Sequence, residues 1–459
     1  MLVAAGSIVV GVVRLGGGRL GDAREGGPSG PGGAASAEAG SGATPYAGPP
    51  NVVLITLCSL RADRVGAFGD ATAQTPYLDA LAAEGVTFTH AWSPATYTLP
   101  SHAALFTGLL PGHAGVLDTT DEIAADVPTL PEVLRDYGYH PLAYVPVASL
   151  ASVHKGGGFE RGFEAFIEGH AGGIGHSALA AVRATPEPFF LLAHFKDAHR
   201  PYLERTESDS VDPRITEWNR RMATPEGRPP DPDDWFYAQT RADPALADAV
   251  SRLYDGAVSR ADADVGALVE GLRAAGRLDD TVLVVAGDHG EALGEGGHYG
   301  HQGFLQPEVL HVPLIVRLPG GEGAGTRVND DVSLVDLLPT LLDAVGAKAP
   351  ARLDGRSLLP VMRGVALPER PAIAQSFLPG ERREAGPAVV AVAGGDWLFR
   401  NPATHTTVAL HDDGDGWVPA AAAPEALGAA LDQLPADVAP TTHPITAAEK
   451  QAVQTQGYW

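Results

Sequence analysis

The segment NVVLITL, residues 51–57, decides how this chain folds. It is apolar almost without interruption, which is typical of a strand covered on both faces in a parallel sheet. Apolar runs at 189–193 and 281–286 also lead into polar residues, and a helical pattern spans 246–275. Thr75 precedes a shorter helical pattern as its expected N-cap. This alternation predicts an α/β fold, a doubly wound and mostly parallel sheet flanked by helices.

Composition divides the chain into three parts. Residues 1–49 are apolar at first and then rich in Gly, Ala, Ser and Pro, which predicts a disordered or signal-like segment followed by a linker. Residues 50–365 form the expected main α/β domain, in which 203–240 interrupt the pattern as an insertion or lid near a site. Residues 366–459 predict a small C-terminal subdomain that includes a short pair of strands, followed by a tail.

Charge and cysteine content narrow the classes of function. The 459 residues carry a net charge of −24, and 44% of them are hydrophobic, enough for a large core. A surface this acidic repels phosphate backbones, which argues against nucleic-acid binding. Cys58 is the only cysteine, so an intrachain disulfide and a cysteine-cluster zinc site are both excluded. Because a chain without disulfides is tolerated in every compartment, the cysteine count leaves the location open.

The first residues bear on targeting. Residues 2–13, LVAAGSIVVGVV, are too few for an ordinary transmembrane helix, and no basic residue precedes them. They resemble the apolar core of a signal peptide whose true start lies upstream, or they belong to a disordered tail with a few valines. We favour the first interpretation and expect an exported or cell-envelope protein rather than a cytoplasmic one. Any membrane contact is then confined to this segment, and the sequence does not indicate an oligomeric state.

Polar side chains gather where the expected strands end, which is where ligands bind in an open α/β sheet. The three clusters are DHGE at 288–291, TLPSH at 98–102, and the group of His194, Lys196, Asp197 and His199. An Asp-His pair can bind one metal ion, and a hydroxyl at the start of a helix lies beside free backbone amides. The third cluster offers cations to an anionic substrate. Taken singly, each has a simpler explanation: a capping Asp, a capping Thr or a structural histidine.

Together, and in this order, the clusters resemble the successive blocks of the sulfatase family, a branch of the alkaline-phosphatase superfamily. The segments that carry the resemblance are NVVLITLCSLRADRVGAFG, SPATYTLPSHAALFTGLLPGHAGV, HFKDAHRPY, YDGAVSRADADVGALVEGL, GDHGEALGEGGHYGHQGFLQPEVLHVPLIVRLPG and VSLVDLLPTLLDAVGAKAPARLDGRSLLP. They cover residues 50–362. The resemblance implies a metal-dependent hydrolase whose substrate is an anionic ester of sulfate or phosphate.

The resemblance also implies roles for four residues of this chain. Thr98 occupies the position of the nucleophile. His102 stands where sulfatases usually have an arginine beside it, and His199 matches a contact to a substrate oxygen. His301 lies close to the place of a lysine in formylglycine sulfatases, where the threonine-bearing subset tends to have histidine.

Thr98 decides between two mechanisms of the family. Sulfatases convert a Cys or Ser at this position into formylglycine, but oxidation of a threonine cannot give that aldehyde, so no formylglycine is expected. A threonine alkoxide on a divalent metal is what phosphodiesterases and phosphoglycerol transferases of the superfamily use, with a covalent phosphothreonine as intermediate. The resemblance therefore favours a phosphoester hydrolase or transferase over a formylglycine sulfatase.

Cys58 is the second departure from the family, which carries an acidic metal ligand at this position. A thiolate binds zinc and similar ions, so Cys58, Thr98, Asp288 and His289 are expected to hold one divalent ion. Zn²⁺ or Mn²⁺ is favoured over Ca²⁺ or Mg²⁺, because the hard cations prefer oxygen ligands. Loss of the acidic ligand keeps an alternative open, a catalytically impaired pseudoenzyme that binds an anionic ligand.

Overall fold

The structure is a computed structural model that describes residues 48–146, 150, 157–169, 173–200, 202, 212–223, 232–301, 303–377, 386–414 and 416–434. The expectations for the segment up to residue 47 and for the tail from residue 435 lie outside the described residues. Within the described ranges, no helix combines the length and the apolar composition needed to cross a membrane.

The main sheet of the described chain has eight strands, seven parallel and one antiparallel. In spatial order they are β10 (Thr326–Ser333), β2 (Val86–Trp92), β9 (His311–Arg317), β6 (Thr281–Gly287), β1 (Asn51–Leu57), β5 (Phe189–Phe195), β3 (His140–Pro146) and β4 (Ala165–Gly169). Strand β1 lies near the middle, between β6 and β5, and β9 is the antiparallel member. The predicted α/β fold with a mostly parallel sheet is confirmed.

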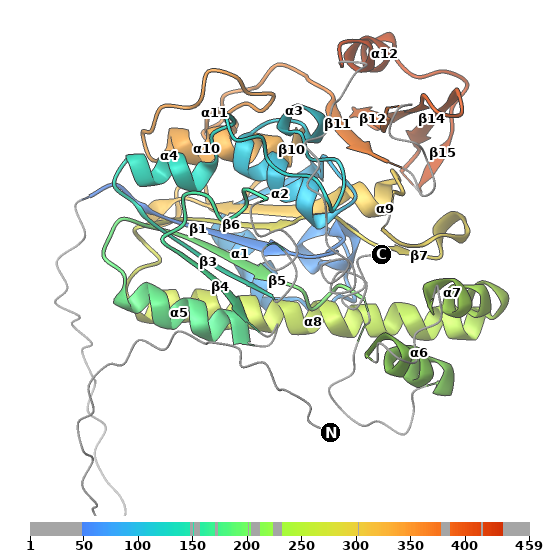
Figure 1. Ribbon diagram of the computed structural model, residues 1–459, viewed down its shortest axis with the longest axis horizontal. Helices are drawn as coiled ribbons and strands as arrows, with labels where there is room; N and C mark the ends of the chain where they lie inside the picture. The colour runs from blue at the N-terminus through green and yellow to red at the C-terminus, as the bar shows by residue number, and fades with distance from the viewer. Residues whose placement is uncertain are drawn as a thin grey trace, which may run out of the picture. The chain divides into compact units, whose positions relative to one another are not determined.

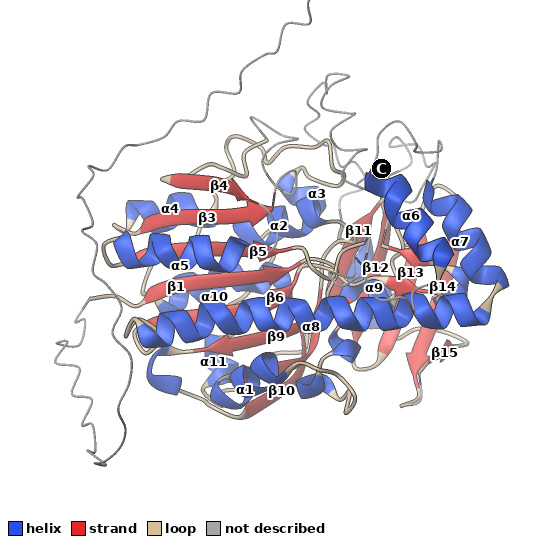
Figure 2. Ribbon diagram, turned by 90° about the horizontal axis from the view of Figure 1, so that it is seen from below, coloured by secondary structure: helices blue, strands red, loops and turns tan. Residues whose placement is uncertain are grey.

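Helices cover both faces of this sheet (Figures 1 and 2). Val52 and Leu54 of β1 pack on one face with α2 (Thr98–Thr107), α4 (Leu130–Asp136) and α10 (Leu337–Ala344). Val53 and Ile55 pack on the other face with α1 (Pro76–Glu84), α5 (Ile174–Ala184) and α8 (Pro244–Ala274). Alternate residues of a strand point to opposite faces, so a strand covered twice must be apolar throughout. This is why β1 lacks a polar face.

Thr75 does precede a helix, but its hydroxyl does not cap it. Helix α1 begins at Pro76, and no capping hydrogen bond from the Thr75 side chain is present. The hydroxyl instead accepts the backbone N–H of Gly66 at 2.9 Å and donates to Asp79 at 3.2 Å. Thr75 therefore holds the expected N-cap position, but its hydroxyl bonds to Gly66 and Asp79 instead of to the free amides of the first turn.

Two smaller parts flank the sheet. The insertion contains α6 (Pro213–Ala223) and α7 (Pro232–Ala242), which pack through Trp218 stacked on Phe236 at 4.3 Å between ring centroids. The C-terminal part is an antiparallel sheet followed by α12 (Glu425–Asp432). Its strands are β11 (Ala372–Ser376), β12 (Ala388–Ala393), β13 (Asp396–Asn401), β14 (Thr406–Asp412) and β15 (Trp417–Pro419). The expected strand pair is therefore part of a larger sheet. The remaining short elements are α3 (Pro111–Ala114), α9 (Pro307–Leu310), α11 (Leu359–Met362), β7 (Ala292–Leu293) and β8 (Tyr299–Gly300).

Candidate active site

The pairing of two central strands places the first site residues. Leu57 of β1 lies beside Gly287 of β6 in parallel register, so Cys58 and Asp288 leave the same edge of the sheet. The backbone N–H of Ser59 then donates to Asp288 Oδ1 at 3.1 Å. Ser59 reaches this position with a φ of 60°, a left-handed conformation that few non-glycine residues adopt. The turn after β1 is therefore shaped around the Asp288 carboxylate.

Thr98 comes to this edge from a helix. It is the first residue of α2, and its Oγ1 lies 3.4 Å from Cys58 Sγ and 3.3 Å from His289 Nε2. Cys58 Sγ lies 3.9 Å from the same ring nitrogen. All four predicted metal-site residues, Cys58, Thr98, Asp288 and His289, are thus brought together, and each is at most 1% exposed. Thr98 follows the N-cap Tyr97 rather than being the cap itself.

The hydrogen bonds of this group suit a metal ion. Nδ1 of His289 donates to the carbonyl oxygen of Gly290 at 2.9 Å, which leaves the Nε2 lone pair directed at Thr98 and Cys58. One ligand atom each of Cys58, Asp288 and His289 lie within 4.8 Å of one another. A sulfur, an oxygen and an imidazole nitrogen form a donor set that zinc accepts. The residues present therefore fit the divalent ion that the sequence predicts.

Burial acts on the protonation of two site residues. Burial, reinforced by the negative charge of Asp288, raises the pKa of the Cys58 thiol well above its ordinary value. The thiolate therefore forms only when a cation stabilises it. Burial lowers the pKa of Lys196 to about 8, so this amine carries its charge below that pH and loses it above.

His102 supports Thr98 from inside the protein. One turn along α2, its Nδ1 lies 2.9 Å from the carbonyl oxygen of Thr98 and its Nε2 lies 3.0 Å from the hydroxyl of Thr56. The same hydroxyl lies 2.8 Å from Nδ1 of His194. His102 is fully buried with both ring nitrogens engaged. Its place is behind the nucleophile, where it orients α2.

His301 and His199 lie on the other side of His289. The ring of His301 is 4.3 Å from that of His289 and 5.3 Å from that of His199, between centroids. Nδ1 of His301 donates to Glu291 at 2.7 Å, and burial lowers the pKa of His301 to about 4. Nδ1 of His199 donates to the carbonyl oxygen of Arg200 at 2.5 Å. Both rings therefore use Nδ1 in these hydrogen bonds, and the ring of His301 lies against that of His289, a predicted metal ligand.

Sequence reasoning overlooked the residues that hold this group in place. The hydroxyls of Ser93 and Ser101 both donate to the carbonyl oxygen of Asp288, at 2.5 and 2.6 Å. Thr56 joins two histidines, and Glu291 fixes the ring of His301. Glu291 had a signal, since it stands three residues after Asp288 in the same motif. The hydroxyl residues had none, because their partners are distant in the sequence.

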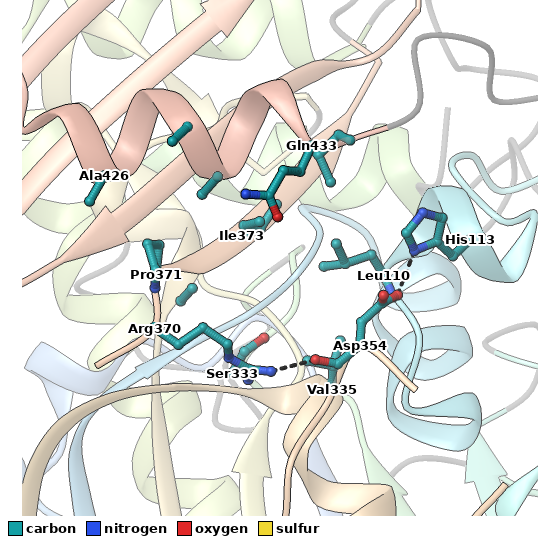
Figure 3. A pocket seen from close by; sticks show the side chains of 14 residues that line it. Leu110, His113, Ser333, Val335, Asp354, Arg370, Pro371, Ile373, Ala426 and Gln433 are labelled. Atoms are coloured by element: carbon teal, nitrogen blue, oxygen red, sulfur yellow. Dashed lines mark hydrogen bonds and ion pairs between the residues drawn. The ribbon is translucent and has the colours of Figure 1, made fainter. Parts of the chain in front are cut away.

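A separate pocket lies between the C-terminal helix and the main domain (Figure 3). Its volume is about 470 Å³, and its walls include Leu110, Ile373 and Gln433. At one end, Nδ1 of His113 lies 2.6 Å from Asp354 Oδ2. The predicted site residues do not line this pocket. It is therefore not where the predicted chemistry takes place.

The fold and the site together define a class of protein. A parallel sheet whose strand ends bring a hydroxyl, an imidazole, a carboxylate and a thiol within metal-binding reach is typical of hydrolases that cleave anionic esters with the help of a metal ion.

The family follows from comparison with known proteins. The family model described as Sulfatase matches residues 50–173 and 175–347, so the chain belongs to the sulfatase family. An N-acetylglucosamine-6-O-sulfatase of Bacteroides thetaiotaomicron is 24% identical over 395 residues, covering 68% of this chain and 71% of that protein. Arylsulfatase A of Bos taurus is 29% identical over 356 residues, covering 69% and 68%.

Solved structures share the fold. The phosphonate monoester hydrolase of Agrobacterium radiobacter has a TM-score of 0.66 at 20% identity, covering 89% of this chain and 96% of that one. A phosphonate monoester hydrolase from Silicibacter pomeroyi has a TM-score of 0.62 at 20% identity, covering 80% and 90%. The chain is thus an ester hydrolase of the sulfatase family with the architecture of its alkaline-phosphatase-like relatives.

Proposed function

We propose that this protein cleaves phosphoesters through Thr98 as nucleophile. The observation that carries the proposal is the position of Thr98 Oγ1 at the start of α2, 3.3 Å from His289 Nε2 and 3.4 Å from Cys58 Sγ. The amides of the first helical turn and the positive end of the helix dipole favour an anionic ester oxygen at this place. No other predicted site residue combines a nucleophilic oxygen with this environment.

Each residue of the site has a separate role in a double displacement at phosphorus. His301 takes the proton of the Thr98 hydroxyl as Oγ1 attacks phosphorus, and it gives that proton to the leaving oxygen as the P–O bond breaks. Water then attacks the phosphorus of the phosphothreonine while the same imidazole takes a proton from the water, and the imidazole gives that proton to Oγ1 as the bond between Oγ1 and phosphorus breaks. Glu291 stabilises His301 while the ring carries the extra proton. His199 donates to an oxygen of the ester. A divalent ion held by Cys58, Thr98, Asp288 and His289 would lower the pKa of the Thr98 hydroxyl and neutralise the charge of the ester oxygens.

We further propose that Cys58, Thr98, Asp288 and His289 hold one divalent ion, Zn²⁺ or Mn²⁺ in preference to Ca²⁺ or Mg²⁺. The thiol supports this choice, because sulfur favours the softer ions. No formylglycine takes part, since Thr98 is the residue at the nucleophile position.

The substrate is proposed to be an anionic ester, with a sulfate ester as the second candidate because the sequence relatives are named sulfatases. The insertion at 203–240 is proposed to frame the entrance. The ring of Tyr237 in α7 stacks on that of Tyr299, which precedes His301 by two residues, at 4.9 Å between centroids. The Tyr237 hydroxyl accepts a hydrogen bond from Arg200 at 3.3 Å. The acidic composition speaks against nucleic acid as a partner, and residues 2–13 support export.

Thr98→Ala and Thr98→Ser test the nucleophile. We expect the alanine variant to lose turnover of an aryl phosphodiester and of an aryl sulfate, while the serine variant keeps a measurable rate. Mass spectrometry of acid-quenched wild type should find one phosphoryl group on the peptide that contains Thr98. Wild-type rates in the alanine variant would refute the assignment. Binding of vanadate to wild type without any turnover would favour the pseudoenzyme alternative.

A further inference from the structure

A second group of metal-ligating side chains lies behind the first. His102, His194 and Asp288 come from α2, from β5 and from the end of β6, and each is 0% exposed. One ligand atom of each lies within 4.8 Å of the other two. Nδ1 of His102 lies 3.8 Å from Asp288 Oδ2, while Asp288 Oδ1 lies 3.6 Å from His289 Nε2. The two carboxylate oxygens therefore face two different groups.

Two atoms of this inner group have unused lone pairs. Nε2 of His194 and Oδ2 of Asp288 are buried and have no hydrogen-bond partner among the residues that the structure describes. Asp288 Oδ1, in contrast, accepts the backbone N–H groups of Ser59 at 3.1 Å and His289 at 2.8 Å. A buried carboxylate oxygen without a donor is costly, and a cation is what removes that cost.

Thr56 directs the two imidazoles. Its hydroxyl oxygen has two lone pairs, and it lies 3.0 Å from Nε2 of His102 and 2.8 Å from Nδ1 of His194. Because His102 Nδ1 donates to the carbonyl oxygen of Thr98, its Nε2 accepts the Thr56 O–H, while His194 Nδ1 donates to the Thr56 oxygen and leaves His194 Nε2 unprotonated. A hydrogen-bonded partner on the far nitrogen is how metal-ligating histidines are generally oriented. To bind a cation, His102 takes the other tautomer: its Nε2 donates to the Thr56 oxygen, and its Nδ1 gives up the hydrogen bond to the carbonyl oxygen of Thr98.

We propose that His102, His194 and Asp288 bind a second divalent cation, and that Asp288 bridges it to the ion held by Cys58 and His289. Two imidazole nitrogens and a carboxylate oxygen form a donor set that zinc accepts. Each carboxylate oxygen then serves one ion. The site lies directly beneath the backbone of Thr98, so the second ion stabilises the start of α2 rather than contacting the substrate.

The inference goes beyond the proposed function, and the two can fail separately. His289 belongs only to the first site and His194 only to the second. We would strip the metal with a chelator, reload with Zn²⁺, remove the excess, and measure metal per chain by elemental analysis. The variants are His289→Ala and His194→Gln, with His113→Ala as a control histidine outside both sites. Circular dichroism establishes that each variant is folded, and His194→Asn replaces His194→Gln if it is not.

We expect two equivalents of zinc in wild type and in the control, and one equivalent in each of the other variants. One equivalent in wild type that survives His194→Gln and is lost in His289→Ala overturns the second site and leaves the proposed function intact. One equivalent that is lost only in His194→Gln upholds the inner site and removes the metal from the proposed mechanism. An absence of bound zinc in every protein overturns both proposals.

Substitution with cobalt tests for the second metal site independently of the zinc content. Co²⁺ bound by a thiolate shows a sulfur-to-metal charge-transfer band, whereas Co²⁺ bound only by nitrogen and oxygen does not. His194→Gln should keep the charge-transfer band and lose part of the visible ligand-field absorption. His289→Ala should weaken the charge-transfer band. Equal spectra for wild type and His194→Gln at saturating cobalt would overturn the inner site.

Discussion

Replacing Cys58 by aspartate should change both the metal preference and the stability of the metal-free protein. The thiol of Cys58 must lose its proton before it can bind a metal ion strongly. At pH 7 that loss costs more than about 2.7 kcal/mol, because the ordinary thiol pKa of 9.0 is already well above 7 and burial raises it further. The ordinary pKa of an aspartate is about 3.9, so at the same buried position its deprotonation at pH 7 costs less than that of the thiol. The Cys58→Asp variant should therefore bind Mn²⁺, Mg²⁺ and Ca²⁺ at least about 100-fold more tightly than wild type.

The same change should destabilise the protein when metal is absent. Cys58 and Asp288 are both buried, so the new carboxylate would face an existing one without a cation between them. An unpaired buried charge costs about 3–5 kcal/mol of unfolding free energy. Saturating metal should restore most of this, since about 4 kcal/mol is gained at a ligand concentration 1,000 times Kd.

The assay is urea unfolding of chelator-treated protein, followed by titration with each metal. Cys58→Ser is the matched control, because it removes the thiol and introduces no charge. We expect the serine variant to be nearly as stable as metal-free wild type and to gain little from hard cations. The reasoning would be refuted if metal-free Cys58→Asp were as stable as wild type and no metal shifted either unfolding curve. That result would leave the pseudoenzyme alternative standing.

Three further predictions follow from other parts of the structure. Glu291→Gln should lower kcat about tenfold or more, since the amide stabilises protonated His301 less well than the carboxylate does. Its metal content should stay unchanged; steady-state kinetics and elemental analysis check the two expectations. Burial lowers the pKa of Lys196 to about 8, so its charge is present below that pH and lost above it. KM for an anionic ester should therefore rise above pH 8 in wild type and stay level in Lys196→Arg, as pH-dependent kinetics would show. Trp218→Ala should cost about 3–5 kcal/mol in urea unfolding, because the ring is fully buried against Phe236.

Much of the site could be predicted from local sequence. Cys58 and Asp288 each follow a continuous apolar run, and the carboxyl ends of parallel strands meet at one edge of a sheet. Thr98 was expected at a helix start, and α2 begins there. Thr75 holds the predicted N-cap position, but its hydroxyl makes no capping hydrogen bond, because it bonds to Gly66 and Asp79. Capping depends on what else competes for the hydroxyl, and that competition is not visible in sequence.

His102 shows which contacts of the site can be predicted from the sequence and which are defined only by the tertiary structure. It follows Thr98 by one helical turn, and an i, i+4 pair must lie on one face of α2, so its closeness to the nucleophile is contained in the sequence. The sequence does not predict that Nε2 of His102 contacts the Thr56 hydroxyl, or that this hydroxyl also contacts His194.

The sequence by itself determined three central strands, the helix after Thr75, the long helix at 246–275 and the edge of the sheet at which the polar residues gather, because apolar periodicity and covalent order act locally. Only the tertiary structure decided that β1 lies between β5 and β6, which puts Thr56 beside His194 in register and Leu57 beside Gly287. Strand order depends on how all the helices together cover both faces of the sheet. These contacts join residues that are far apart along the chain, so no short stretch of sequence predicts them. The inner group of His102, His194 and Asp288 exists because of that order, since its members stand 92 and 94 residues apart along the chain.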